Sequence, residues 1–176
     1  MSDLLDLDYS KCDEFHLTGI DLDHESLERA EQSAALKGKK GNCSFVCEDA
    51  WHLSFKNAFD LLTSNGLNIY EADEIRAVAL YTQFFKALKP RGALVISFLT
   101  PPPIPGFITE WGLQNVNKEH ALFQKIVFAD ILASKWQTYR SEALMRSQLQ
   151  EAGFEEIEVV YDNAHIFPTV IAKKPS

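Results

Sequence analysis

Strand-like apolar stretches alternate with helix-like stretches along this chain, and the strand-like stretches end in carboxylates or small polar residues. Residues 15–21 form an apolar stretch that ends at Asp21, and residues 58–63 form another that runs into Ser64 and Asn65. Alternation of this kind favours an α/β fold with a mostly parallel sheet covered on both faces. Ligands of such folds lie beyond the carboxyl ends of the strands. The pattern therefore predicts a ligand site formed by the residues that follow the strands.

The expected elements make a doubly wound sheet of about six strands with the last one antiparallel. Strands are predicted over residues 15–21, 43–47, 58–63, 93–98, 157–161 and 167–172, and helices over 24–37, 71–88, 118–138 and a further segment that stops at Gly153. The inward-facing residues expected in the helix over 71–88 are Ile75, Val78, Ala79, Phe85 and Leu88. A length of 176 residues, 46% of them hydrophobic, suits a single domain spanning 1–176.

Charge and composition restrict the partners and the compartment. The chain has 17 Lys plus Arg and 25 Asp plus Glu, and its formal net charge of -8 repels nucleic-acid phosphates. No apolar run approaches the roughly 20 residues that span a membrane, and the acidic start of the chain does not resemble a signal peptide. Three cysteines, without a second Cys or His pair at zinc-like spacing, favour a reducing compartment and no metal site. We therefore expect a cytoplasmic protein with no nucleic-acid or membrane partner.

Asp21 is the first candidate binding residue. A carboxylate just past a buried strand can accept hydrogen bonds from both hydroxyls of a ribose. The alternative is that Asp21 and Asp23 only cap the helix that follows, and Asp23 is the better candidate for that cap. The neighbouring Leu22 can lie against the face of an adenine ring.

A second group of candidates follows the next two strands. Asp49 can accept a hydrogen bond from an adenine amino group while the Ala50 amide donates to a ring nitrogen, or Asp49 can be a solvated loop acid. Ser64 and Asn65 can contact the amino-acid part of a cofactor, or they can form an ordinary turn between a strand and a helix. Substrate-side candidates with less support are Tyr70, Glu71, Trp136, Tyr139, Arg140 and His165.

In this order the motifs resemble those of the class I S-adenosylmethionine-dependent methyltransferases. The resemblance rests on residues 18–23, 47–50, 59–62 and 88–94, followed by a closing antiparallel hairpin. It implies a Rossmann-like fold, S-adenosylmethionine as cofactor and a small-molecule acceptor. It also implies ribose contact at Asp21, adenine contact at Asp49 and Ala50, and the methionine region near Ser64 and Asn65. Residues 99–140 match the position of a substrate-side loop and helix insertion.

The first strand of that family, with its Gly-rich turn, has no counterpart before residue 15. Asp3, Asp6 and Asp8 suit a short helix instead, so we expect a sheet that lacks its first strand and a chain truncated at the N-terminus. Each buried backbone group left unpaired costs about 1–3 kcal/mol, so something should fill the gap. The neighbouring strands could close on each other, or a second copy could lend an element in a homodimer.

Three function hypotheses remain. The first is a methyltransferase, in which catalysis is mostly positioning, so that no catalytic residue is assigned. The second is an inactive methyltransferase-like remnant that acts as a binding or self-associating module, because a Gly-rich turn normally lets the backbone approach the cofactor closely. The third, a nicotinamide-dependent oxidoreductase, is disfavoured by the C-terminal hairpin and by the lack of a Tyr-x-x-x-Lys pair.

Overall fold

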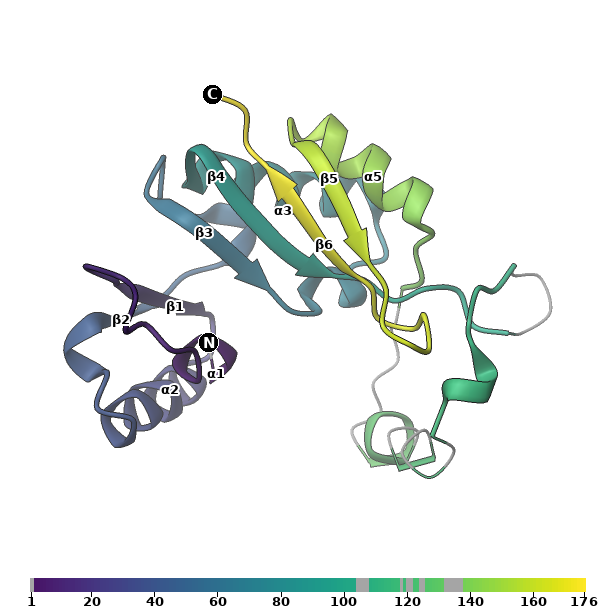
Figure 1. Ribbon diagram of the computed structural model, residues 1–176, viewed down its shortest axis with the longest axis horizontal. Helices are drawn as coiled ribbons and strands as arrows, with labels where there is room; N and C mark the ends of the chain where they lie inside the picture. The colour runs from purple at the N-terminus through teal and green to yellow at the C-terminus, as the bar shows by residue number, and fades with distance from the viewer. Residues whose placement is uncertain (1, 104–107, 118, 120–121, 124–125, 132–137) are drawn as a thin grey trace. The chain divides into compact units, whose positions relative to one another are not determined.

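The computed structural model describes residues 2–103, 108–117, 119, 122–123, 126–131 and 138–176 (Figure 1). The chain forms two compact units, Met1–Leu53 and Ser54–Ser176. Each unit has its own strands and helices. The expectations of a single domain and of an insertion over 99–140 remain predictions.

The first unit is built on a pair of parallel strands, β1 (Leu17–Asp21) and β2 (Cys43–Cys47), in register from Leu17 opposite Cys43 to Asp21 opposite Cys47. Its other elements are α1 (Ser2–Leu5), α2 (His24–Leu36) and the 3₁₀ turns η1 (Lys40–Asn42) and η2 (Ala50–His52). The short helix predicted near the start of the chain is confirmed by α1. Among residues 2–16 the structure describes no strand, so β1 has β2 as its one described neighbour.

A small core and one cation hold the N-terminal segment on the first unit. Leu5, Leu17 and Ala34 are buried together. The Lys39 ammonium donates hydrogen bonds to the carbonyls of Leu5 and Leu7, both at 2.8 Å, and lies 4.9 Å from the centroid of a tyrosine ring. The segment before β1 is therefore anchored by both apolar burial and polar contacts.

The second unit is a four-stranded sheet in the order β3-β4-β6-β5 (Figure 1). Its elements are β3 (Phe59–Ser64), η3 (Leu67–Tyr70), α3 (Glu74–Ala87), β4 (Leu88–Ser97), η4 (Leu113–Asn115), the π-helical η5 (Ile126–Ile131), α5 (Glu142–Glu151), β5 (Glu155–Val160) and β6 (Thr169–Lys173). Strands β3 and β4 are parallel, whereas β6 lies between β4 and β5 and runs antiparallel to both. The predicted α/β fold and its antiparallel C-terminal strand are confirmed.

Two expectations about the second unit are wrong in detail. Ile75 is 82% exposed, and the buried face of α3 consists of Ala77, Leu80, Tyr81, Phe84 and Ala87. Both sets have helical spacing, but the observed one places the large side chains of Tyr81 and Phe84 in the interior and so buries more apolar area. Strand β4 starts at Leu88 rather than at residue 93, because Leu88 already pairs with Phe59. The register then shifts, and regular pairing resumes where Ala93 lies opposite Leu61. Of the helix predicted over 118–138, residues 118, 120–121, 124–125 and 132–137 lie outside the described residues.

Candidate functional site

The carboxyl ends of β1 and β2 are joined to each other. Asp21 is in register with Cys47, and the amide of Glu48 donates to the Asp21 carbonyl at 3.2 Å. The Cys47 thiol donates to the Leu22 carbonyl at 3.5 Å. The turn that carries Asp21 and Leu22 therefore lies beside the turn that leads to Asp49, as the sequence predicted for neighbouring parallel strands.

The structure separates the roles of the two aspartates after β1. Asp23 caps α2, because its carboxylate accepts from the amides of Glu25 and Ser26 and from the Ser26 hydroxyl. The Ser26 hydroxyl, followed by the Glu25 amide, holds the Asp23 pKa below its usual range. The predicted cap is confirmed. Asp21 takes no part in that cap beyond accepting the Asp23 amide on Oδ1 at 3.0 Å.

Asp21 and Leu22 both keep groups available to a ligand. Asp21 is exposed, and its Oδ2 has no hydrogen-bond partner in the part of the chain that the structure describes. Leu22 is 65% exposed, so its side chain is accessible to an apolar face of a ligand. The pair thus offers an anionic acceptor next to an apolar contact.

The Asp49 carboxylate makes more contacts within the protein than the Asp21 carboxylate does. Its Oδ1 accepts from the amide of Trp51 at 3.0 Å, and its Oδ2 lies 2.8 Å from Nδ1 of His52. Asp49 is the cap of η2. The Ala50 amide, at the start of η2, has no acceptor among the described residues, as expected of the first amides of a helical turn. The Asp49–His52 contact was missed from the sequence, although a spacing of three residues after a cap can signal it.

Ser64 and Asn65 lie in the second unit, at the end of β3. Asn65 is exposed, and its Oδ1 accepts from the Ser97 hydroxyl at the end of β4, at 2.7 Å. Gly66 has φ 86°, a left-handed conformation that turns the chain from β3 into η3. Of the predicted site residues, the structure thus brings Asp21, Leu22, Asp49 and Ala50 together in one unit and places Ser64 and Asn65 in the other.

The weaker substrate-side candidates have mainly structural contacts. Glu71 pairs with Arg76 at 2.8 Å, and Tyr139 forms a bridge with Leu99. Arg140 is 1% exposed and donates to the Glu74 carboxylate and to two backbone carbonyls. The remaining three are Tyr70, which is 51% exposed, His165, whose ring is tilted by 37° against that of Tyr161 with centroids 4.7 Å apart, and Trp136, which lies outside the described residues.

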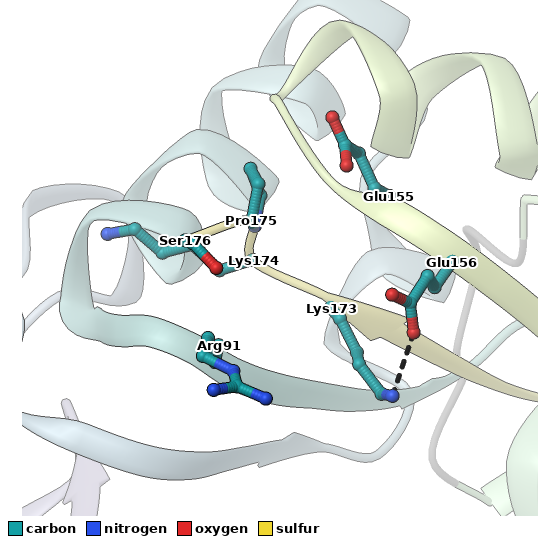
Figure 2. A pocket seen from close by; sticks show the side chains of 7 residues that line it. All are labelled: Arg91, Glu155, Glu156, Lys173, Lys174, Pro175 and Ser176. Carbon is teal, nitrogen blue, oxygen red and sulfur yellow. Dashed lines mark hydrogen bonds and ion pairs between the residues drawn. The ribbon is translucent and has the colours of Figure 1, made fainter.

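A separate polar pocket lies at the other end of the four-stranded sheet. Figure 2 shows Lys173 reaching the carboxylate of Glu156, at 2.8 Å, with Arg91 nearby. Lys173 pairs with Ala93, whereas the carboxyl end of β4 pairs with the start of β6. This pocket is therefore remote from Ser64 and Asn65 within that unit.

The described residues lack two kinds of feature. They contain no group of three or more His, Cys, Asp or Glu side chains that could hold a metal ion. None of their helices has the length and apolar character needed to cross a membrane.

Comparison with known proteins identifies the family. The family model of a methyltransferase domain matches residues 3–153. The chain belongs to the S-adenosylmethionine-dependent methyltransferases. The resemblance seen in the sequence motifs is thereby confirmed. No curated protein matches the chain.

Solved structures agree with this methyltransferase fold. A possible exported protein from Bordetella parapertussis is 46% identical, with a TM-score of 0.89 over 100% of this chain and 59% of that chain. A S-adenosylmethionine-dependent methyltransferase from Methanosarcina mazei is 20% identical, with a TM-score of 0.57 over 90% of this chain and 81% of that one. An O-methyltransferase family 2 protein from Planctomyces limnophilus, solved with apigenin, is 16% identical, with a TM-score of 0.66 over 94% and 45%. The chain thus spans 59% of the length of its 46%-identical match.

Proposed function

We propose that this methyltransferase domain binds S-adenosylmethionine through the paired ends of β1 and β2 and serves methyl transfer to a small molecule. The cofactor supplies an electrophilic methyl group on a sulfonium. Asp21 accepts the ribose hydroxyls, Leu22 lies on the adenine, and Asp49 with the Ala50 amide recognises the adenine edge. For Ser64 and Asn65, in the other unit, contact with the methionine part is proposed on the family resemblance alone.

The observation that carries the proposal is the Asp21 Oδ2, which has no hydrogen-bond partner among the described residues and lies beside an exposed Leu22. Both follow a strand end that is bonded to the turn before Asp49. A ribose needs an anionic acceptor, and an adenine needs an apolar face with a donor and an acceptor at its edge. The two turns supply each of these groups. The residues therefore fit the cofactor.

A small molecule is proposed as the methyl acceptor on the basis of the net charge of the chain. The net charge of -8 disfavours nucleic acid as a substrate, and the Planctomyces relative was solved with a small aromatic molecule. A cytoplasmic location is proposed on the cysteine content of the chain.

A second function, that of a methyltransferase-like binding or self-associating module, is supported by different observations. Oxygens of Asp49 and Asn65 are already bonded to protein groups, and β1 and β3 each have one strand neighbour among the described residues. A strand edge without a partner is a template for pairing with another chain, so this module would form a homodimer.

Calorimetric titration with S-adenosylhomocysteine separates the two functions. We expect the wild-type protein to bind, and Asp21→Asn to bind about 10–100-fold more weakly, because a hydrogen bond to a charged group contributes about 1.5–3 kcal/mol. Asn keeps the acceptor for the Asp23 amide, so the turn is preserved. The matched control is Glu31→Gln, which removes an exposed carboxylate paired with Lys40 in the same unit.

Two outcomes contradict the methyltransferase proposal. One is a folded wild-type protein that gives no heat at millimolar ligand, particularly if light scattering finds a dimer. The other is an Asp21→Asn variant that binds as tightly as the Glu31→Gln control.

A further inference from the structure

A buried arginine joins η3 to the segment that precedes α5 in the second unit. Arg140 is 1% exposed and lies directly before Ser141, the cap of α5. Its Nη1 donates to the Asn68 carbonyl and its Nη2 to the Glu71 carbonyl, both at 2.7 Å. These two carbonyls lie within and just after η3. The planar guanidinium therefore holds η3 at two points with donors in a rigid fork, whereas an ammonium would sit on a flexible stem.

Backbone hydrogen bonds tie residues 138–140 both to η3 and to Leu99, just after β4. The Arg140 amide donates to the Leu99 carbonyl at 2.8 Å, and the Thr138 amide donates to the Ile69 carbonyl at 2.7 Å. Tyr139 and Leu99 also form a parallel bridge. Residues 138–140 thus bond both Leu99, two residues after the end of β4, and η3.

The positive charge of Arg140 is deeply buried, but its carboxylate partner is half exposed. Its Nε lies 3.2 Å from Glu74 Oε2, whose side chain is 47% exposed and which also accepts from Gln148. The side-chain oxygens of Asn68 and Gln148 are buried without a hydrogen-bond partner among the described residues. A buried charge in such a setting is weak evidence of stabilisation, because apolar replacements of buried ion pairs are often as stable. The fixed geometry that Arg140 imposes on η3 is the better physical account of its presence.

The segment that Arg140 holds begins at a proposed binding turn. Gly66 is the cap of η3, and the Ile69 amide donates to its carbonyl at 3.0 Å. The next anchor of this turn is the Asn65–Ser97 bond. Movement of η3 would therefore shift Ser64 and Asn65 directly.

We propose that Arg140 is a positioning residue, which holds η3 and through it sets the Ser64–Gly66 turn at the geometry that the cofactor needs. The role in cofactor binding rests on the proposed function. The role in ordering η3 does not, since it concerns the free protein.

Hydrogen exchange followed by NMR tests the ordering of η3 without any ligand. In Arg140→Lys we expect the Ile69, Glu71 and Thr138 amides to exchange at least about tenfold faster than in the wild type, while the α3 amides change less than about twofold. In Glu74→Gln, which removes the charge partner but keeps both carbonyl contacts, we expect η3 to keep its protection within about twofold. Arg29→Lys, at an exposed ion pair in the first unit, controls for the substitution itself.

Cofactor binding is measured on the same variants. We expect Arg140→Lys to weaken S-adenosylhomocysteine binding by at least about fivefold and Glu74→Gln to leave it unchanged. If the wild type does not bind the ligand, the proposed function fails, and the exchange data alone decide whether Arg140 orders η3.

Three results would overturn the positioning role. The first is unchanged protection of η3 in a folded Arg140→Lys protein, and the second is equal loosening in Glu74→Gln. If Arg140→Lys does not fold, native-state exchange of the wild type in urea decides: the Ile69, Glu71 and Thr138 amides should open with one shared free energy, and independent opening is the third contrary result.

Discussion

Gly153 ends α5, and its replacement by alanine is expected to destabilise the second unit. Gly153 has φ 104°, and its amide donates to Gln150 while the Phe154 amide donates to Leu149. These two bonds form the Schellman motif of a helix terminus, which needs a left-handed residue. A Cβ at Gly153 would lie 3.0 Å from two ring atoms of Phe85.

The expected cost has two parts. A left-handed conformation costs an L-residue about 1–2 kcal/mol, of which about 0.4–1 kcal/mol is offset by the reduced freedom of the unfolded chain. The contact with Phe85 adds about 1–3 kcal/mol, because overpacking forces a neighbour out of position. Phe85 cannot move freely, since it packs edge-on against Phe154 at 5.3 Å. We expect about 1–5 kcal/mol in total.

Gly38 provides a matched control. It also has a positive φ, 68°, at the end of α2, but a Cβ there would meet nothing within 4 Å. Gly38→Ala should therefore show only the conformational part, about 1 kcal/mol. Native-state hydrogen exchange of α5 amides for one variant and of α2 amides for the other measures the two free energies of opening. If Gly153→Ala costs no more than Gly38→Ala, the steric reasoning is wrong.

Three further predictions follow from single contacts. Asp23→Ala should reduce the exchange protection of the first turn of α2, whereas Asp23→Asn should keep most of it, because Asn also caps helices. The Tyr161 hydroxyl, followed by Arg146, holds the pKa of Glu142 below its ordinary value of 4.5, so this contribution to stability is present above pH 4.5 and is lost as the pH falls through the lowered value. Glu142→Gln should therefore show less acid destabilisation below pH 4.5 in pH-dependent unfolding, and an unchanged acid limb would contradict this. Lys39→Met should make residues 2–9 more sensitive to limited proteolysis, and equal cleavage rates would show that the hydrogen bond to Leu5 does not hold the segment.

Most of the fold could be predicted from local sequence patterns. The strand Cys43–Cys47, the cap at Asp23 and the stop at Gly153 all follow from rules that act over a few residues, namely apolar runs, capping side chains and left-handed glycine. The closing hairpin was also predictable, because a short turn-rich link joins two apolar stretches. These features need no knowledge of distant contacts.

Contacts between residues far apart in the sequence determine the features that could not be predicted. The inward face of α3 is chosen by the sheet on which it packs, and two stripes of similar spacing compete, so Ile75 was wrongly placed inside. Arg140 bonds Asn68 and Glu71, 72 and 69 positions away, and no local pattern indicates such a partner. The neighbouring positions of Asp21 and the turn before Asp49 were predictable from parallel pairing, whereas the bond between Asp49 and His52 depends on side-chain conformation.

The central claim is that the ends of β1 and β2 bind the adenosyl group. Titration of the ¹⁵N-labelled protein with S-adenosylhomocysteine, followed by NMR amide shifts, tests it most directly. We predict saturable shifts at the amides of Leu22 and Ala50, with little change at Arg91 and Lys173 in the remote pocket. Shifts confined to that pocket, or no saturable shift in the folded protein, would contradict the claim.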